Sequence, residues 1–253
     1  MKIAIVGAKG LLGEACMRVF ALHDGIEAIG ITRDDVDLRD LSQVEEFMRA
    51  LDYDVCVYAA AISGLEECKD NPVDAMQVNA LAPEVIARVS HERGSRVVYI
   101  STDYVFEGEE DSRPDEDSYV NPVNVYGKSK REGELRVMEQ CPEALVCRVS
   151  WLFGRGRDTF VDQVMQLALR GEVASYIGDK FSVPNYCDDL AQALMDLLIR
   201  EDGKKATGVI HLTNQAEPES WYSYAQQIAD TANHLGLAKS YSQSILSTDL
   251  ADA

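Results

Sequence analysis

The sequence is poor in histidine and has no paired cysteine motif. Its four histidines are scattered along the chain, at His23, His91, His211 and His234. The six cysteines form no CxxC pair, and Cys56 and Cys147 lie in runs that we predict to be buried strands. Because the spacing of metal ligands is missing, we predict free thiols in a reducing compartment and no metal site.

Positive charge and long apolar runs are also scarce. The 24 Lys and Arg residues are outnumbered by 43 Asp and Glu residues, which gives a net charge of −19. Such a surface repels phosphate backbones, so nucleic-acid binding is not expected. No apolar run reaches the length of a membrane span, and the first strand begins at Lys2, where a signal peptide would otherwise lie. We therefore expect a soluble, cytoplasmic protein with no membrane partner.

Short apolar runs alternate with helical patterns along the first 150 residues. The runs typical of strands buried on both faces are Ile3–Val6, Ile26–Ile31, Asp54–Tyr58, Arg96–Ile100 and Leu145–Val149. Between the second and third of them, Ser42–Leu51 has a helical apolar stripe, and Ser42 and Glu45 predict a capping box. The alternation predicts an α/β fold of the Rossmann type, with a doubly wound parallel sheet.

A glycine-rich turn follows the first strand. Gly7, Gly10 and Gly13 stand between the apolar run and a helical stretch at Leu11–Leu22. This order is typical of a dinucleotide-binding unit, because glycines let the backbone approach a pyrophosphate while helix amides hold its charge. An ordinary glycine turn is the alternative. We predict that the NAD(P) contacts here are Gly7, Lys9, Gly10, Leu11, Leu12 and Gly13.

The residues after the second strand bear on the choice of cofactor. An acidic residue there binds the ribose 2′-hydroxyl of NAD, whereas a basic residue accommodates the 2′-phosphate of NADP. The chain has Arg33 at this place and Lys9 in the glycine turn, but Asp34 and Asp35 follow directly. The two positive charges favour NADP(H) over NAD(H), and the two aspartates weaken the preference.

The pattern changes after Trp151. Helices are predicted at Thr159–Arg170, Asp188–Arg200 and Ser220–Leu235, with one short strand at Val209–Leu212. We therefore expect an NAD(P)-binding domain at 1–150 and a smaller, mostly helical substrate domain at 151–253, with the two domains interleaved. The acidic segment Glu107–Asp117 is too polar for a core and is either a solvated loop or a mobile edge of the active-site cleft.

Hydroxyl side chains end the fourth apolar run. Ser101 and Thr102 follow Ile100 directly, and ligands of open parallel sheets bind beyond the carboxyl ends of the strands. We therefore predict that both residues face the cofactor and the substrate. Local turn chemistry, in which hydroxyls bond to nearby backbone, is the alternative.

Tyr126 and Lys130 are four residues apart in a helical segment, so they share one face of the helix. A tyrosine that exchanges protons near neutrality must lose about 3 units from its reference pKa, which amounts to ~4 kcal/mol. One ammonium group ~4.5 Å away, at an effective dielectric constant of ~20, supplies a similar energy. We predict that Tyr126 donates a proton and that Lys130 lowers the pKa of Tyr126.

Together these segments resemble the extended short-chain dehydrogenase/reductase superfamily, and within it the dTDP-4-dehydrorhamnose reductases. The resemblance covers nearly the whole chain, and its most specific parts are Ser101–Phe106 and Asn124–Lys130. It implies that NADPH reduces the C4 ketone of a nucleotide-linked 6-deoxy sugar in dTDP-rhamnose biosynthesis. Tyr126 would be the acid, Thr102 would bond the developing oxyanion, and Lys130 would also hold the nicotinamide ribose.

The same resemblance assigns further residues to each ligand. Those implied to lie along the adenine and the dinucleotide are Asp37, Leu38, Ala59, Ala60 and Ala61. Ser101 is implied on the cofactor side as well. Those implied to contact the substrate are Asp103, Tyr104 and Trp151. For Trp151, packing between the domains is the alternative.

Three other functions are compatible with parts of the pattern. A sugar-nucleotide dehydratase of the superfamily typically has Glu after the Thr-Asp pair, and Tyr104 at this position argues against dehydration. A sugar-nucleotide epimerase keeps the same Tyr and Lys, so it stays an alternative. The other alternative is a non-catalytic binding protein like the regulatory subunit of methionine adenosyltransferase.

Two departures from the family pattern concern assembly and the substrate pocket. Some relatives dimerise through a magnesium ion held by a Glu two residues after the turn's last glycine. Ala15 has that position here, and Glu14 points ~100° away around the helix. We infer no such metal site, although a homodimer is compatible with the sequence.

The chain also ends at Ser247–Ala253, where the family usually continues with an Arg-Pro segment. We therefore expect either a shortened chain or an incomplete substrate pocket.

Overall fold

The computed structural model describes residues 1–108, 113–199, 206–237 and 245–248, so the last residues of the chain lie outside the described ranges. Contacts divide the chain into two compact units. The first is Met1–Val149 with Asp188–Leu212, and the second is Ser150–Cys187 with Thr213–Ala253. Across the described ranges, the helices are too short or too polar to cross a membrane.

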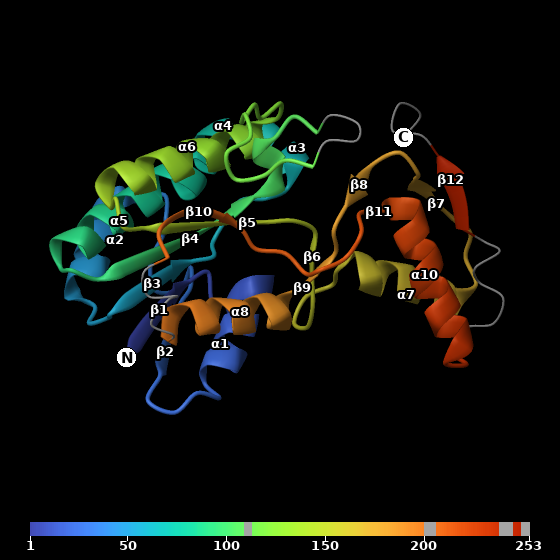
Figure 1. The fold of residues 1–253 in the computed structure, drawn as a ribbon, viewed down its shortest axis with the longest axis horizontal. Coiled ribbons are helices and arrows are strands. Elements are labelled where there is room, and N and C mark those ends of the chain that lie inside the picture. Colours follow the sequence, from blue (N-terminus) through green and yellow to red (C-terminus); the bar gives the residue numbers. More distant parts are fainter. Residues whose placement is uncertain (109–112, 200–205, 238–244, 249–253) are drawn as a thin grey trace. The chain divides into compact units, whose positions relative to one another are not determined.

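A six-stranded parallel sheet forms the centre of the first unit (Figure 1). Its strands are β1 (Lys2–Val6), β2 (Glu27–Ile31), β3 (Val55–Tyr58), β4 (Arg96–Thr102), β5 (Leu145–Val149) and β10 (Gly208–His211). They lie in the order β10-β5-β4-β3-β1-β2, with every neighbouring pair parallel. The predicted doubly wound sheet is confirmed. Its order reverses between β1 and β3, where open sheets of this kind bind ligands.

Helices cover both faces of this sheet (Figure 1). On one face lie α2 (Leu41–Ala50), α5 (Ala82–Glu92) and α6 (Val125–Gln140), with the shorter α3 (Leu65–Asp70), α4 (Pro72–Met76) and the π-helical turn η1 (Gln77–Leu81). On the other face lie α1 (Leu11–Phe20) and α8 (Cys187–Ile199). The 3₁₀ turn η2 (Asp103–Val105) follows β4 directly. Because both faces are covered, every residue of β3 and β5 is buried.

Two buried tyrosines fix η1 against the sheet. The rings of Tyr58 and Tyr99 lie 6.0 Å apart, and both side chains are fully buried. Their hydroxyls donate to the carbonyls of Val78 and Asn79, each at 2.6 Å. A buried phenol needs such a partner. These bonds therefore hold η1 beside the carboxyl ends of β3 and β4.

The described part of the second unit contains two helices and short strand pairs. α7 (Phe160–Arg170) begins at a capping box of Thr159 and Asp162, and α10 (Trp221–His234) begins at Ser220. The pairs are β6 (Leu152–Phe153) with β9 (Asn185–Tyr186), β7 (Ala174–Ile177) with β12 (Ile245–Thr248), and β8 (Phe181–Ser182) with β11 (Glu219–Ser220). Apolar residues of both helices pack together in its core.

The division into units differs from a single boundary at residue 150. α8 and β10 lie in the range that we assigned to the substrate domain, but they complete the first unit. β10 pairs with β5 in register from Gly208 to His211, and Arg18 of α1 forms an ion pair with Asp188 of α8. Because β10 pairs with the edge strand β5, the segment with α8 and β10 belongs to the first unit.

The predicted cap of α2 is wrong. The side chain of Asp40, and not that of Ser42, caps the helix, because it accepts hydrogen bonds from the amides of Ser42 and Gln43. Glu45 instead accepts from Arg49 and Arg88. One aspartate that satisfies two free amides is a strong cap, and it starts the helix at Leu41.

Candidate active site

The glycine turn packs tightly between β1, β3 and α1. Gly7 has a φ of +87°, and a Cβ there would lie 2.7 Å from the amide nitrogen of Ala60. A Cβ at Gly13 would lie 2.2 Å from the carbonyl oxygen of Gly7. No side chain caps α1, and within the described part of the chain the amides of Leu11 and Leu12 have no recorded partner. Free helix amides beside a turn without side chains fit a pyrophosphate.

The loop after β3 forms the other wall of this turn. Asn79 of η1 is fully buried and holds Ile62 through two hydrogen bonds of 2.9 Å, one to its amide and one to its carbonyl. Its Nδ2 also donates to Ser129 Oγ on α6. The loop is thereby fixed with Ala60 against Gly7. We did not predict a role for Asn79, although a single Asn within the apolar Val78–Leu81 is a readable signal.

The other predicted cofactor residues of this region surround the turn. Leu38 packs against the apolar clusters of the first unit, and Ala59 donates its amide to the carbonyl of Val6. Both residues are half-buried, as is Ala61. The predicted dinucleotide contacts thus lie around the ends of β1 and β3.

Charged residues follow β2. Lys9 Nζ lies 2.5 Å from Asp34 Oδ2, so this lysine is already paired. Asp37 accepts from Nε and Nη2 of Arg39 at 3.0 and 2.8 Å, and Arg39 lowers the pKa of Asp37 to about 2. Arg33 is exposed, and no ion pair of its guanidinium is recorded among the described residues. Of the predicted basic pair, Arg33 is therefore the charge available to a phosphate.

Thr102 and Tyr126 meet at the carboxyl end of β4. Thr102 is buried; its Oγ1 donates to Asp103 Oδ1 at 3.0 Å and accepts from the amide of Tyr104 at 3.2 Å. Tyr126 lies near enough for Thr102 to lower the pKa of its phenol, against the larger effect of burial. The ring of Tyr104 packs edge-on against that of Tyr126, with centroids 5.7 Å apart. The structure therefore brings these four predicted site residues together.

The start of α6 places Tyr126 against η2. Asn124 caps the helix, since its side chain accepts from the amide of Gly127 at 2.8 Å. A Cβ at Gly127 would lie 2.1 Å from the carbonyl oxygen of Tyr104. Only glycine permits this approach, so the sequence around Tyr126 fixes both where the helix begins and how closely it packs.

Lys130 lies one turn further along α6 and is 1% exposed. Its Nζ donates to the carbonyl of Ile100 at 2.7 Å and lies 4.0 Å from the ring centroid of Tyr99. Burial lowers the pKa of Lys130 to about 7, and the charge of Glu134 opposes this shift. The amine is therefore close to half protonated at neutral pH.

The predicted lowering of the Tyr126 pKa is wrong. Burial raises the pKa of this phenol above its ordinary value; Thr102 opposes that shift, and the charge of Asp103 adds to it. Lys130 does not offset this shift, because its own pKa is lowered to about 7 and its Nζ donates to the carbonyl of Ile100 on β4. Tyr126 thus keeps its proton until a stronger base, such as an alkoxide, takes it.

Ser101 and Arg148 bond to a residue that we had not singled out. Ser101 is 2% exposed, and its Oγ donates to Glu134 Oε1 at 2.6 Å. Arg148 donates to the same carboxylate from Nε and Nη2, both at 2.9 Å. Both side chains are therefore engaged within the protein. Charged residues lie all around α6, so spacing gave no sign that Glu134 is the buried one.

Trp151 belongs to the second unit and has a φ of +31°. Its ring stacks on Trp221 with centroids 5.5 Å apart and also packs against Phe160 and Tyr224. The half-buried indole therefore has a packing role within its own unit. Its predicted contact with the sugar stays a prediction.

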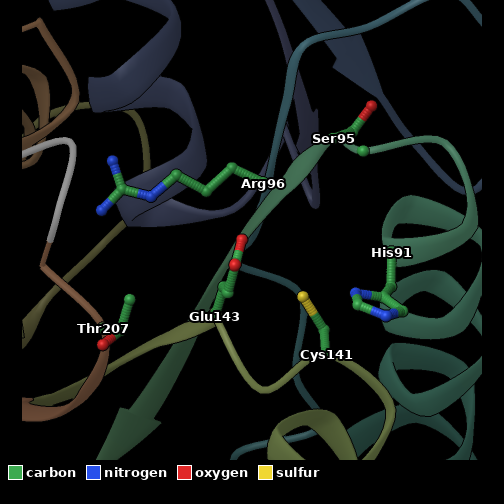
Figure 2. Close-up of a pocket in the computed structure, with 7 residues that line it drawn as sticks. His91, Ser95, Arg96, Cys141, Glu143 and Thr207 are labelled. Atoms are coloured by element: carbon green, nitrogen blue, oxygen red, sulfur yellow. The ribbon is translucent and has the colours of Figure 1, made fainter.

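A separate pocket of about 400 Å³ lies at the other end of the sheet (Figure 2). Its lining residues are His91, Gly94, Ser95, Arg96, Cys141, Glu143 and Thr207. Arg96 begins β4 and Thr207 precedes β10, so the pocket faces the amino ends of the strands. Ligands of open parallel sheets bind at the carboxyl ends. Because the pocket also contains none of the predicted site residues, we place the candidate active site elsewhere, around Thr102 and Tyr126.

All six cysteines are buried thiols. Among the residues that the structure describes, no group of three or more His, Cys, Asp or Glu side chains could hold a metal ion. The candidate site is therefore built from hydroxyls, one buried amine and backbone amides.

Similarity to known proteins extends over nearly the whole chain. The family described as RmlD substrate binding domain matches residues 1–249. The dTDP-4-dehydrorhamnose reductase of Salmonella typhimurium is 30% identical over 240 residues, which cover 94% of this chain and 80% of that protein. The protein of the same name from Aggregatibacter actinomycetemcomitans is 28% identical over 236 residues, which cover 91% and 79%.

Solved structures agree with these relatives. The dTDP-4-dehydrorhamnose reductase of Bacillus anthracis, in complex with NADP, aligns with a TM-score of 0.88 and 27% identity, covering 100% of this chain and 85% of that one. The family match spans the glycine turn, the end of β4 and the start of α6, where the predicted site residues lie. The chain therefore belongs to the RmlD substrate binding domain family.

Proposed function

We propose that the protein is an NADPH-dependent dTDP-4-dehydrorhamnose reductase, which reduces the C4 ketone of a dTDP-linked 6-deoxy-4-keto sugar. The observation that carries the proposal is the hydroxyl pair of Thr102 and Tyr126 at the carboxyl end of β4, one helical turn from the buried Lys130. The names of the similar proteins supply the substrate class. The NADP complex of the Bacillus anthracis protein supports the choice of cofactor.

The chain has groups that fit each part of the cofactor. The amides of Leu11 and Leu12 would hold the pyrophosphate, and Arg33 would bond the 2′-phosphate. Gly7, which packs directly against Ala60, keeps the turn beside these amides free of a side chain. When bound, NADPH supplies the hydride.

The chain's own residues manage the oxygen and the proton. Thr102, whose hydroxyl donates to Asp103 in the structure, would turn this hydrogen to the ketone oxygen as negative charge develops there. Tyr126, which burial keeps protonated, donates its proton to the same oxygen. Lys130 titrates near neutrality one turn away on the same helix, so it can return a proton to the phenol. Asp103 and Tyr104 would contact the sugar from η2.

The direct test is to follow the loss of NADPH absorbance with dTDP-4-keto-6-deoxy sugars and to identify the products. Reduction at C4 supports the proposal. Product formation without net NADPH loss, with cofactor retained through purification, would instead show an epimerase. NADPH binding without turnover of any of these sugars would favour a non-catalytic subunit.

A cytoplasmic location and a homodimer are further parts of the proposal. Six buried thiols suit a reducing compartment. Cell fractionation tests the location, and sedimentation of the purified protein tests the assembly. Recovery in a membrane fraction, or a monomeric mass at all concentrations, would contradict the respective part.

A further inference from the structure

Glu134 has a fully buried carboxylate on α6. Oε1 accepts from Ser101 Oγ at 2.6 Å and from Arg148 Nε at 2.9 Å. Oε2 accepts from Arg148 Nη2 at 2.9 Å and from Arg131 Nη1 at 2.8 Å. One carboxylate therefore connects β4, β5 and α6.

The location of these bonds matters for the candidate active site. Tyr126, Lys130 and Glu134 follow one another at intervals of four residues and so share a face of α6. Lys130 bonds the carbonyl of Ile100, and Glu134 bonds the hydroxyl of Ser101. These are the two residues directly before Thr102. The bonds from Lys130 to Ile100 and from Glu134 to Ser101 thus hold α6 in a fixed position on β4, next to Thr102 and Tyr126.

Stability alone does not explain this buried ion pair. Arg148 is 4% exposed, and its Nη1 is buried without a hydrogen-bond partner among the described residues. A buried pair loses the hydration of both ions, and apolar residues of similar volume are often at least as stable. An incompletely bonded pair of this kind is better explained by the geometry that it imposes on its neighbours.

Glu134 also acts on the charge of Lys130. Its negative charge raises the pKa of Lys130 against the lowering by burial. Other titratable or charged groups on the elements around α6 include Cys68 and Glu67 on α3, Asp74 on α4, Tyr99 on β4, Asp103 and Tyr104 on η2, Cys147 and Arg148 on β5, and Tyr126, Lys128, Arg131 and Glu132 on α6 itself. The charge that raises the pKa of Lys130 is that of Glu134.

We propose that Glu134 is a positioning residue: through Ser101 and Arg148 it holds β4 against α6 so that Thr102 and Tyr126 meet, and its charge compensates the Lys130 ammonium. The proposal rests on the proposed reductase function. It extends the site to a fully buried carboxylate.

The main test compares Glu134→Gln with Glu132→Gln. Glu132 lies on the same helix but forms a partly exposed ion pair with Arg136. Glu134→Gln should lower kcat by about 10- to 100-fold, because small displacements of catalytic groups have such effects. KM for NADPH should change less than ~2-fold, since no cofactor contact is lost. Glu132→Gln should match the parent protein, and equal kcat values for the two variants would overturn the proposal.

Ser101→Ala separates positioning from cofactor contact. If the Ser101 hydroxyl acts through Glu134, kcat falls and KM for NADPH is unchanged. A raised KM for NADPH with unchanged kcat would show instead that the hydroxyl contacts the cofactor, and the link through Ser101 would then be abandoned.

A third measurement does not depend on turnover. The pKa of Lys130 can be followed by NMR of the ¹⁵N-labelled lysine side chains in the protein without ligands, with Lys130→Met to assign the signal. Glu134→Gln should move that pKa to a lower value, while Glu132→Gln should not. If Glu134→Gln alone does not fold, the double variant Glu134→Gln with Arg148→Met is used in its place in all comparisons. The second substitution removes the Arg148 charge, which would otherwise be buried without its partner. A parent protein without turnover would refute the reductase function, whereas an unmoved Lys130 pKa would refute the role of Glu134.

Discussion

Tyr126 and Lys130 share a helix face, and burial moves their pKa values in opposite directions. The pKa of Tyr126 is raised and that of Lys130 is lowered to about 7, so in both cases the uncharged form gains. At the scale of the residue, this arrangement makes Tyr126 a donor that stays protonated and Lys130 a group that exchanges protons at neutral pH. With these pKa values, Tyr126 can protonate an alkoxide, whereas its own phenolate form is disfavoured.

The first prediction at this scale concerns the proton donor. Tyr126→Phe keeps the ring and removes the acid, so kcat should fall by ~10²- to 10⁴-fold, the usual contribution of general acid catalysis. NADPH affinity should change little. Tyr119→Phe removes a hydroxyl from a residue that is 86% exposed and serves as the control. Parental turnover by Tyr126→Phe would mean that the proton comes from another group.

A second prediction concerns the two basic residues near the adenosine ribose. Arg33→Ala should narrow the gap between NADPH and NADH affinity by about 1 to 3 kcal/mol, as for a charged hydrogen bond. Lys9→Ala should narrow it less, because Asp34 already pairs with Lys9 at 2.5 Å. Fluorescence titration with both cofactors measures these gaps. An equal or larger effect of Lys9→Ala would reverse the assignment.

At the scale of the element, the site depends on how closely loops and helices approach each other. The glycine turn lets α1 begin against β1 with free amides, and Gly127 lets α6 begin against η2. Asn79 in η1 then joins the loop after β3 to α6. Each contact leaves no space for a Cβ or for an unpaired polar group.

Gly13→Ala tests this closeness. The new Cβ would lie 2.2 Å from the carbonyl oxygen of Gly7, so α1 must shift away from the turn. We expect a loss of about 1 to 3 kcal/mol in stability, as for other overpacked sites, together with weaker NADPH binding. Gly64→Ala is the matched control, because its Cβ would meet mainly the flexible side chain of Glu67 at 3.3 Å. Thermal unfolding and cofactor titration of both variants give the comparison, and equal behaviour would contradict the prediction.

At the scale of the whole molecule, the predicted catalytic and cofactor residues all lie in the first unit, and both tryptophans lie in the second. Trp151 and Trp221 stack on each other there. Tryptophan fluorescence therefore reports on the second unit, whereas the larger share of the backbone signal in far-UV circular dichroism comes from the first. Unfolding of the first unit should therefore be followed by far-UV circular dichroism.

The buried amine of Lys130 should make stability depend on pH. Its pKa is about 7 in the folded protein and near 10.5 when unfolded. Between these values the unfolded chain binds more protons, so raising the pH stabilises the folded state. Relative to Lys130→Met, the parent protein should gain about 2 kcal/mol in unfolding free energy between pH ~7 and pH ~9. Urea denaturation followed by far-UV circular dichroism measures the difference, and a constant difference would show that Lys130 is not buried as a neutral amine.

Local interactions allowed much of this protein to be predicted from the sequence. Buried strands, the glycine turn and the spacing of Tyr126 and Lys130 depend on neighbours within a few residues, so their patterns can be read directly. The parallel sheet and its doubly wound arrangement follow from these patterns and agree with the structure.

Tertiary structure decided the features that depend on distant contacts. The burial of Glu134 against Ser101 and Arg148 joins three elements, and nothing in the charged sequence of α6 distinguishes it. β10 follows the start of the second unit in the sequence but belongs to the first unit, because it pairs with β5. The raised pKa of Tyr126 depends on desolvation by the packed chain. Burial and pairing are properties of the folded assembly of elements, so sequence spacing alone does not reveal them.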